Sequence, residues 1–362
     1  MILFLHNRYR TLGGEERVAA DLLWLVREHL SEDAEILERD SADLGRRAAA
    51  TGMLRGGLDP AEVGRAVRRT GARVVHAHNV NPAFGWRALA AAREAGARVV
   101  LHLHQYRLVC AVGVCFTEGA ECTRCHGRNT FPGVLRRCRG SASEAAVYGA
   151  GLALWQRRLA AQVDAFVVPS RFAAERLEVL GAPLGATHVL PPVIREFVAG
   201  SRVGEGGHAL FVGRLAAEKG VDVAIEACRR AGVPLVVAGD GPLREGLDGA
   251  RLVGRVSDAE LAGLRAAAGV AVVPSRSAET FGLAAAEAMA AGLPVAASRV
   301  GALPELLGDE GLVAPGDPAA LAEAITRLHG DAAAGERALR RARSLVSAEV
   351  VAPALAAIYG SL

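Results

Sequence analysis

The sequence predicts an α/β protein made of two doubly wound domains, each a parallel sheet covered by helices. Short β-rich runs alternate with segments of helix length along almost the whole chain, which is the pattern of βαβ units. The 362 residues suffice for two domains, and 51% hydrophobic but only 4% aromatic residues suit helices packed on buried sheets better than a β-sandwich. A break rich in Pro, Gly and Ser, from 191 to 207, divides the alternation into two halves.

Each half supplies six expected strands, with helices between them. In the first half they are 2–6, 34–38, 73–78, 98–102, 165–168 and 188–190, and in the second 209–212, 235–238, 252–254, 270–273, 295–297 and 311–313. We expect one domain at 1–195, with a Cys-rich insertion at 105–140, and a second at 196–346. The helix at about 347–362 is expected to pack back on the first domain. Ligands of doubly wound domains bind beyond the C-terminal ends of the strands, so the site should lie there.

Charge and hydropathy exclude several classes of protein. A net charge of +3 is too small for a dedicated nucleic-acid binder. No apolar run reaches the roughly 18 residues of a membrane span, and the apolar N-terminus is too short for a signal peptide. We therefore expect a cytoplasmic protein, in which six cysteines indicate a metal site or reduced thiols before disulfides.

The basic residues contain one notable exception. Of the 42 Lys and Arg residues, the only lysine is Lys219. A codon bias explains the arginines, but the surviving lysine should lie where a compact ammonium is needed rather than a planar guanidinium. Lys219 follows Gly213 and Arg214 in a strand, glycine turn and helix start at 211–220. Such a turn can direct both cations at one anion near a helix N-terminus, although solvated charges on an ordinary loop remain the alternative.

Two further stretches extend this pattern. The glycine turn around Gly241 follows a strand and alone is a weak signal. In 274–295, a polar loop leads into a helix that begins near Phe281, whose first amides are free to bind phosphate. Glu279 precedes that helix, and Glu287 lies about two turns in. Because the neighbours of Glu287 are alanines, a buried carboxylate is favoured over a surface residue.

The order of these motifs resembles the retaining glycosyltransferases of family 4. The motifs are Gly-Arg-(x)4-Lys-Gly, Gly-Asp-Gly-Pro-Leu and Pro-Ser-(x)3-Glu-(x)-Phe-Gly-Leu-(x)3-Glu-Ala-Met-Ala-(x)-Gly-(x)-Pro-Val, and they match in detail over about 210–314. The resemblance implies the GT-B fold, with two facing Rossmann-like domains and an inter-domain cleft. It implies a hexosyltransferase whose donor is a nucleotide-diphosphate sugar, UDP- or GDP-linked. A nucleotide-sugar epimerase or hydrolase on the same fold is the alternative.

The family also implies roles for individual residues of the second domain. Arg214 and Lys219 would bind the donor diphosphate together with the amides of Phe281, Gly282 and Leu283, so no catalytic metal is expected. Glu279 would contact the donor sugar and Glu287 the ribose. Arg255 and Val256 would line the base pocket, and Thr280 would add a contact.

The acceptor side is less determined. By resemblance, Gly13 and Gly14 form a glycine loop that faces the cleft, and His104 contacts the transferred sugar, with His102 as its rival. Family members usually carry Asp where this chain has Gln105 or Asn79, which leaves the acceptor chemistry open. A glycan, a lipid-linked molecule and a small molecule all remain candidates.

Five of the six cysteines lie between Cys110 and Cys138. The pair Cys122 and Cys125 has chelating spacing, and two more thiolates would complete a tetrahedral zinc site. A subset of family 4 has a similar insertion, which favours Cys110, Cys122, Cys125 and Cys138 as ligands. A disulfide, free thiols, replacement of one cysteine by His126, and a non-enzymatic zinc knuckle remain alternatives.

The arginines at 136–139 and the amphipathic stretch that follows leave open a peripheral contact with an anionic membrane. A solvated basic turn before a core helix is favoured. The sequence does not distinguish a monomer from a homodimer.

Overall fold

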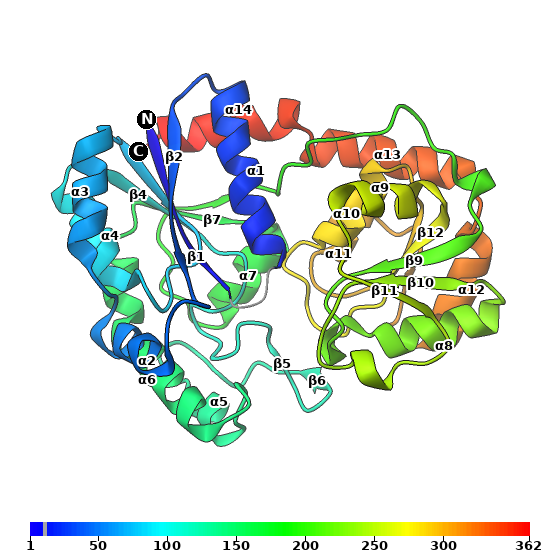
Figure 1. Ribbon diagram of the computed structural model, residues 1–362, viewed down its shortest axis with the longest axis horizontal. Helices are drawn as coiled ribbons and strands as arrows, with labels where there is room; N and C mark the ends of the chain where they lie inside the picture. The colour runs from blue at the N-terminus through cyan, green and yellow to red at the C-terminus, as the bar shows by residue number, and fades with distance from the viewer. Residues whose placement is uncertain (10–12) are drawn as a thin grey trace. The chain divides into compact units, whose positions relative to one another are not determined.

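The computed structural model describes residues 1–9 and 13–362 and divides into two compact units. Unit 1 comprises Met1–Cys115, Cys122–Val193 and Ala348–Leu362. Unit 2 comprises Phe116–Glu121 and Ile194–Ser347. Each unit contains a six-stranded parallel sheet with helices on both faces (Figure 1). The predicted class of two α/β domains with parallel sheets is confirmed.

The sheet of unit 1 has the strand order β2-β1-β3-β4-β7-β8. Its strands are β1 (Ile2–Arg8), β2 (Ala34–Asp40), β3 (Val74–Ala77), β4 (Arg98–His102), β7 (Ala165–Val168) and β8 (Thr187–Val189). Strand order reverses between β1 and β3, because β2 lies on one side of β1 and all later strands lie on the other. Such a reversal parts the loops that leave the two strands and creates the usual ligand position of a doubly wound sheet.

The two faces of this sheet differ in chemistry because side chains alternate along each strand. Leu3, Leu5, Val75 and Leu101 join the apolar core that includes residues of α3 and α4. The opposite face, on the side of α1 and α14 in Figure 1, carries buried histidines instead. The helices of this unit are α1 (Gly14–His29), α2 (Arg46–Arg55), α3 (Pro60–Thr70), α4 (Gly85–Glu94), α5 (Phe131–Leu135), α6 (Ala142–Ala160), α7 (Arg171–Val179) and α14 (Ala348–Gly360).

The sheet of unit 2 has the order β11-β10-β9-β12-β13-β14, which is the Rossmann order 3-2-1-4-5-6 with β9 as its first strand. Its strands are β9 (His208–Val212), β10 (Leu235–Ala238), β11 (Arg251–Gly254), β12 (Ala268–Val273), β13 (Val295–Ser298) and β14 (Leu312–Val313). The reversal here falls between β9 and β12, directly before the two predicted phosphate-binding stretches.

Helices cover both faces of this second sheet and enclose separate cores. Residues of α8 and α12 pack with Phe211 and Val237 on one face, and residues of α10 and α13 pack with Leu210 and Val236 on the other. The helices are α8 (Val221–Ala231), α9 (Asp258–Ala266), α10 (Leu283–Ala290), α11 (Leu303–Leu307), α12 (Pro318–Leu328) and α13 (Ala332–Val346).

Two features differ from the expectations. The Cys-rich insertion contains an antiparallel hairpin, β5 (Phe116–Thr117) and β6 (Ala120–Glu121), that the sequence did not predict. The segment Ala332–Gly360, formed by α13 and α14, is long and apolar enough to cross a membrane by length and composition. Half of its most apolar window is buried inside the structure, as in the core helices of many water-soluble folds.

Candidate functional site

The candidate site of unit 2 forms where the β9 and β12 loops meet. The turn after β9 presses so closely on the loop after β12 that a Cβ on Gly220 would lie 2.1 Å from the carbonyl oxygen of Pro274. Gly220 also has a φ of 67°, a conformation that glycine adopts without strain. The Arg276 amide donates to the Glu218 carbonyl at 2.8 Å and ties the two loops together.

Two cations and two carboxylates gather in these loops. The Lys219 ammonium donates to Glu279 Oε1 at 2.6 Å, and the Ser275 hydroxyl donates to the same oxygen at 2.5 Å. Arg214 pairs with Glu218, four residues further along the same loop. Burial alone would raise the pKa of Glu279, but the charge and hydrogen bond of Lys219 outweigh burial, so this pKa lies below its ordinary value. Glu279 is therefore a carboxylate held beside a cation.

Glu279 also leads directly into the N-terminus of α10. Gly282 precedes this helix with a φ of 99° and provides no side-chain cap. The Ala302 amide donates to the Glu279 carbonyl at 2.8 Å, and a Cβ on Gly301 would lie 2.2 Å from that carbonyl oxygen. The backbone of Glu279 is thus fixed from the β13 side, and the same loop leads directly into the N-terminus of α10. A helix N-terminus of this kind favours an anion.

Glu287 lies within α10 and pairs with Arg265 of α9. Both side chains are largely buried, at 8% and 13% exposed. Sequence reasoning identified Glu287 as a buried carboxylate but missed Arg265. The available signal was an arginine in a small, apolar stretch of a helix, and one arginine among 41 gives little reason to choose it.

The remaining predicted donor residues lie around the same strand ends. A Cβ on Gly241 would lie 2.5 Å from the Leu215 carbonyl oxygen, which brings the β10 loop against the β9 loop that carries Gly213. Arg255 and Val256 directly follow β11, and Arg255 is exposed. Thr280 is half-buried and Phe281 is buried immediately before α10.

In unit 1, histidines line the α1 and α14 side of the sheet. His78 Nδ1 lies 2.7 Å from His104 Nε2, and His76 Nδ1 lies 2.6 Å from the Tyr359 hydroxyl. Burial lowers the pKa of His76 and of His104 to about 3 and lowers those of His78 and His102 well below the ordinary range. These imidazoles are therefore neutral at physiological pH.

Among the described residues, three of these histidines bring their potential metal-ligand atoms close together. Ligand atoms of His76, His78 and His102 lie within 4.8 Å of one another. Their rings are stacked with interplanar angles of 15° to 24°. Because a nitrogen lone pair lies in the plane of its ring, stacked rings do not direct their lone pairs at one point. The observed arrangement is a packed imidazole stack rather than a formed metal site.

A small network of polar side chains follows the histidines. Glu15, at the start of α1, accepts hydrogen bonds from the Tyr9 hydroxyl at 2.7 Å and from Gln105 Nε2 at 3.1 Å. Burial raises the pKa of Glu15, while Arg107 opposes that rise. Sequence reasoning missed Glu15 and Arg107. The predicted Gly13 lies one residue before α1, its amide donates to Glu16 at 2.8 Å, and Gly14 begins the helix.

All six cysteines are free thiols in the structure. Cys110 and Cys125 are buried, and Cys122 and Cys138 are half-buried. The Cys110 sulfur accepts a hydrogen bond from the Gly113 amide at 3.3 Å, and the Cys138 amide donates one to the Gly133 carbonyl at 3.0 Å. Among the residues described, no three of these sulfurs form a group as tight as that of the imidazoles.

Comparisons with known proteins identify the family. The family model described as "Glycosyl transferase 4-like domain" matches residues 13–193, half of the chain, and "Glycosyl transferases group 1" matches residues 206–331. A glycogen synthase of Mycobacterium tuberculosis (strain CDC 1551 / Oshkosh) is 38% identical over 172 residues, 41% of each chain. The GDP-mannose-dependent alpha-(1-6)-phosphatidylinositol dimannoside mannosyltransferase of M. tuberculosis (strain ATCC 25177 / H37Ra) is 36% identical over 190 residues, 46% of this chain and 50% of the relative.

Solved structures with the same fold cover the whole chain. Sucrose-phosphate synthase from Thermosynechococcus elongatus matches with a TM-score of 0.70 at 20% identity, covering 99% of this chain and 98% of its own. Anabaena HepE in complex with UDP and glucose matches with a TM-score of 0.66 at 17% identity, covering 100% and 99%. The chain aligns with only 41% to 50% of the two curated relatives named above. From the two family models, the chain belongs to the glycosyl transferase 4-like family of GT-B glycosyltransferases.

Proposed function

We propose that the protein is a retaining glycosyltransferase that moves a sugar from a UDP- or GDP-linked donor to a hydroxyl acceptor. The observation that carries the proposal is the gathering of Arg214, Lys219 and Glu279 beside the N-terminus of α10, at the strand-order reversal of unit 2. The names of relatives that use GDP-mannose or bind UDP support a nucleotide-sugar donor.

The ion pairs suggest how the donor would be held. An arriving diphosphate would take Lys219 from Glu279 and Arg214 from Glu218, so that both cations and the first amides of α10 face the phosphates. Glu279, released from its cation, would accept hydrogen bonds from hydroxyls of the donor sugar. Glu287, fixed by Arg265, would receive the ribose hydroxyls, and the backbone at Arg255 and Val256 would line the base pocket.

The charge distribution suits a front-face reaction. As the bond between the anomeric carbon and the diphosphate oxygen breaks, positive charge develops on the sugar and negative charge on the departing diphosphate. Arg214, Lys219 and the helix N-terminus would stabilise that negative charge, and one such fixed contact typically contributes about 3 kcal/mol. The acceptor oxygen would bond to the anomeric carbon on the departure side, and a diphosphate oxygen would take its proton. Charge neutralisation by two side chains removes the need for a catalytic metal ion.

We assign the acceptor to unit 1. The glycine loop at Gly13 and Gly14 and the polar residues near His104 follow β1 and β4 at the ligand-binding end of this sheet. His104 would contact the transferred sugar through a neutral imidazole, since burial keeps its pKa at about 3.

A donor screen tests the proposal. UDP-, GDP- and ADP-sugars are offered to the protein without acceptor, and donor hydrolysis and the melting temperature are measured. One donor class should raise the melting temperature and be hydrolysed, and Lys219→Ala should lower hydrolysis about 100-fold. The exposed Arg327→Ala, on α12, serves as the matched loss of one positive charge. Hydrolysis that survives Lys219→Ala contradicts the diphosphate assignment.

We further propose that Cys110, Cys122, Cys125 and Cys138 hold one structural zinc ion. Their thiols are reduced, belong to one unit and have the soft chemistry that zinc prefers. Binding would draw the four sulfurs into one tetrahedral group and would supply folding energy to an insertion with little regular structure. The ion would be structural, since four thiolates leave no open position for substrate.

Elemental analysis tests the zinc assignment. Protein purified under reducing, metal-replete conditions should contain about one zinc per chain. Cys125→Ser should abolish that zinc, whereas Cys228→Ala, on α8 of unit 2, should retain it. Metal-free wild-type protein under these conditions would contradict the assignment.

A further inference from the structure

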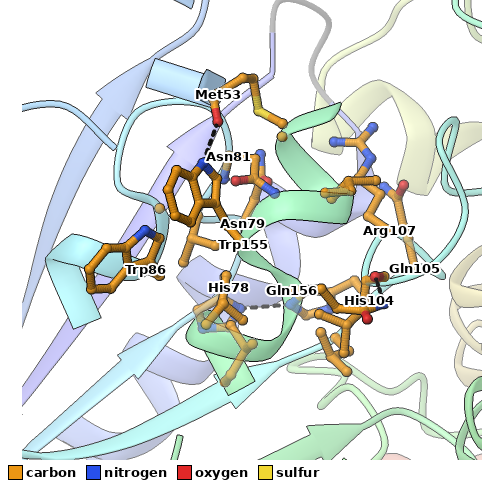
Figure 2. Close-up of a pocket in the computed structure, with 18 of the residues that line it drawn as sticks. Met53, His78, Asn79, Asn81, Trp86, His104, Gln105, Arg107, Trp155 and Gln156 are labelled. Carbon is orange, nitrogen blue, oxygen red and sulfur yellow. Dashed lines mark hydrogen bonds between the residues drawn. The ribbon is translucent and has the colours of Figure 1, made fainter. Parts of the chain in front are cut away.

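A pocket lies within unit 1 beyond the C-terminal ends of β3 and β4, next to the strand-order reversal of this sheet. Figure 2 shows Trp86, Trp155 and Met53 on one side of it and His104, Gln105 and Arg107 on the other. This is the position at which doubly wound sheets bind ligands. The sequence pointed to His104 here and to the amphipathic stretch that carries Trp155, but not to Trp86.

Two tryptophans form the apolar wall of the pocket. The rings of Trp86 on α4 and Trp155 on α6 have centroids 5.8 Å apart and are inclined at 38°. The Trp155 indole N–H donates to the carbonyl oxygens of Met53 and Leu54 at 3.1 and 3.2 Å, which fixes its ring. Arg158 stacks over both rings, at 5.5 and 5.1 Å from their centroids. The wall is therefore an aromatic surface in which hydrogen bonds hold the Trp155 ring.

Buried polar atoms around the pocket lack partners. The Trp86 indole N–H, Gln105 Oε1, Arg107 Nε and His78 Nε2 are buried and have no hydrogen-bond partner among the residues that the structure describes. Leaving such a group unsatisfied costs about 1–3 kcal/mol. The set includes both donors and acceptors, so a ligand that satisfies it must offer both. A hydroxyl group does so, because its oxygen accepts and its hydrogen donates.

The charges lining the pocket cancel. Glu15 and Arg107 are its acidic residue and its arginine, and the histidines are neutral because burial lowers the pKa of each. Arg107 also lies over the ring of Tyr9, at 4.3 Å, which directs its charge toward Glu15 and Tyr9. Among the described residues that line the pocket, Arg107 is the one arginine or lysine, and a phosphate or carboxylate would have to compete with Glu15 for its charge.

We propose that this pocket binds the acceptor, and that the acceptor presents an uncharged, hydroxyl-rich ring such as a terminal sugar. The apolar face of the ring would lie on Trp86 and Trp155, and its hydroxyls would meet Gln105, Arg107 and Glu15. The inference rests on the proposed glycosyltransferase function. It makes Trp86, Trp155 and Gln105 the residues that determine acceptor class, and disfavours an anionic acceptor headgroup in this pocket.

Acceptor binding can be measured without a donor, because all three tryptophans lie in unit 1 and two of them line the pocket. In a Trp24→Phe background, tryptophan fluorescence is titrated with methyl glucoside, galactoside, mannoside and N-acetylglucosaminide and with the corresponding 6-phosphates. At least one neutral glycoside should change the fluorescence saturably, and its phosphate should bind at least tenfold more weakly. Tighter binding of the phosphates, or no response to any neutral glycoside, overturns the proposal.

A transfer assay then separates this inference from the proposed function. Trp155→Ala and Gln105→Ala should each reduce acceptor kcat/KM at least tenfold more than they reduce donor hydrolysis. The control, Trp24→Phe on α1, should leave both rates unchanged. Equal loss of both rates overturns the acceptor pocket while the glycosyltransferase stands. Absence of donor hydrolysis in the wild-type protein defeats the proposed function, and the fluorescence titration still decides whether the pocket binds neutral sugars.

Discussion

Lys219 allows a test at the level of one side-chain nitrogen. It is the only lysine, so its ammonium and the amino group of Met1 are the primary amines of the chain. The Met1 amine pairs with Glu32 at 2.8 Å, in the other unit. If Lys219 binds the diphosphate, UDP or GDP should slow its reductive methylation at least tenfold and leave Met1 unaffected, as measured by mass spectrometry. Glu279→Gln should speed Lys219 labelling in the free protein, because it removes the ion pair. Equal labelling of Lys219 with and without the nucleotide that raises the melting temperature would refute the contact.

Residue spacing predicted the groups that belong to local motifs and missed their distant partners. Lys219 was identified as the only lysine, in a glycine turn before a helix. Glu279 was identified by its place before a helix start and Glu287 by its alanine neighbours. Arg265 and Glu15 were missed because their partners are distant in the sequence. Arg265 pairs with Glu287, 22 residues away, and Glu15 accepts a hydrogen bond from Gln105, 90 residues away. A sequence does not display such contacts, since an arginine on a helix is usually solvated. The roles of all these residues stay predictions until binding is measured.

At the scale of elements, the two ends of α8 provide a matched pair of glycines. Gly220 precedes the helix with a φ of 67°, and Gly232 follows it with a φ of 68°. A Cβ at Gly232 would meet no atom within 4 Å, whereas one at Gly220 would clash with Pro274. Gly232→Ala should therefore cost only the left-handed backbone strain of about 1–2 kcal/mol. Gly220→Ala should cost at least about 2 kcal/mol more, because the β9 and β12 loops must separate, and should also weaken donor binding. Urea unfolding followed by circular dichroism measures both costs, and equal costs would refute the close approach.

Most elements could be predicted from periodicity, and the exception has a local cause. Every strand of the two parallel sheets was expected, with ends displaced by two residues at most. The hairpin of β5 and β6 was missed because each strand has two residues, too few to show alternation. Its turn has positive φ at both Glu118 and Gly119, the backbone of a type I′ turn, for which Asn-Gly or Asp-Gly is the usual signal. Glu-Gly does not give that signal, so nothing in the composition marked the turn.

At the scale of the whole molecule, alternation of strands and helices predicted two parallel sheets but not their strand orders. The same pattern gives one reversal after β1 in unit 1 and a reversal between β9 and β12 in unit 2. Helix packing and loop length select the order, and neither is visible in hydrophobic periodicity. The reversals nevertheless determine where ligands bind. The donor motifs fell at the expected strand ends, whereas the aromatic pocket of unit 1 draws side chains from α2, α4 and α6 that no single motif contains.

The imidazole stack makes unit 1 sensitive to acid in a range where most carboxylates do not titrate. His76 and His104 have a folded pKa of about 3, and those of His78 and His102 are also strongly lowered, against about 6.5 in an unfolded chain. Below pH 6.5 the histidines are therefore protonated in the unfolded chain but not in the folded unit. The free energy of unfolding consequently falls as pH falls, by up to about 1.4 kcal/mol per pH unit for each histidine. The charge of Glu16 opposes the lowering of the His104 pKa, and the Tyr359 hydroxyl contacts His76. Glu15 has a raised pKa, which makes the folded unit more stable as pH falls, but it is one group against four histidines.

Tryptophan fluorescence, which reports unit 1 alone, should show this unit losing stability to urea steadily between pH 6.5 and 5. His102→Phe should reduce that loss by up to about 1.4 kcal/mol per pH unit. Both ring nitrogens of His102 lack partners, so a phenyl ring can replace the imidazole without leaving a polar group unsatisfied. His188→Phe, on the edge strand β8 outside the stack, should leave the pH dependence unchanged. If His102→Phe and wild type lose stability with the same slope, burial of neutral histidines does not govern the acid response. The carboxylates of unit 1 that are held below their ordinary pKa, such as Glu16 and Glu32, must then account for it at lower pH.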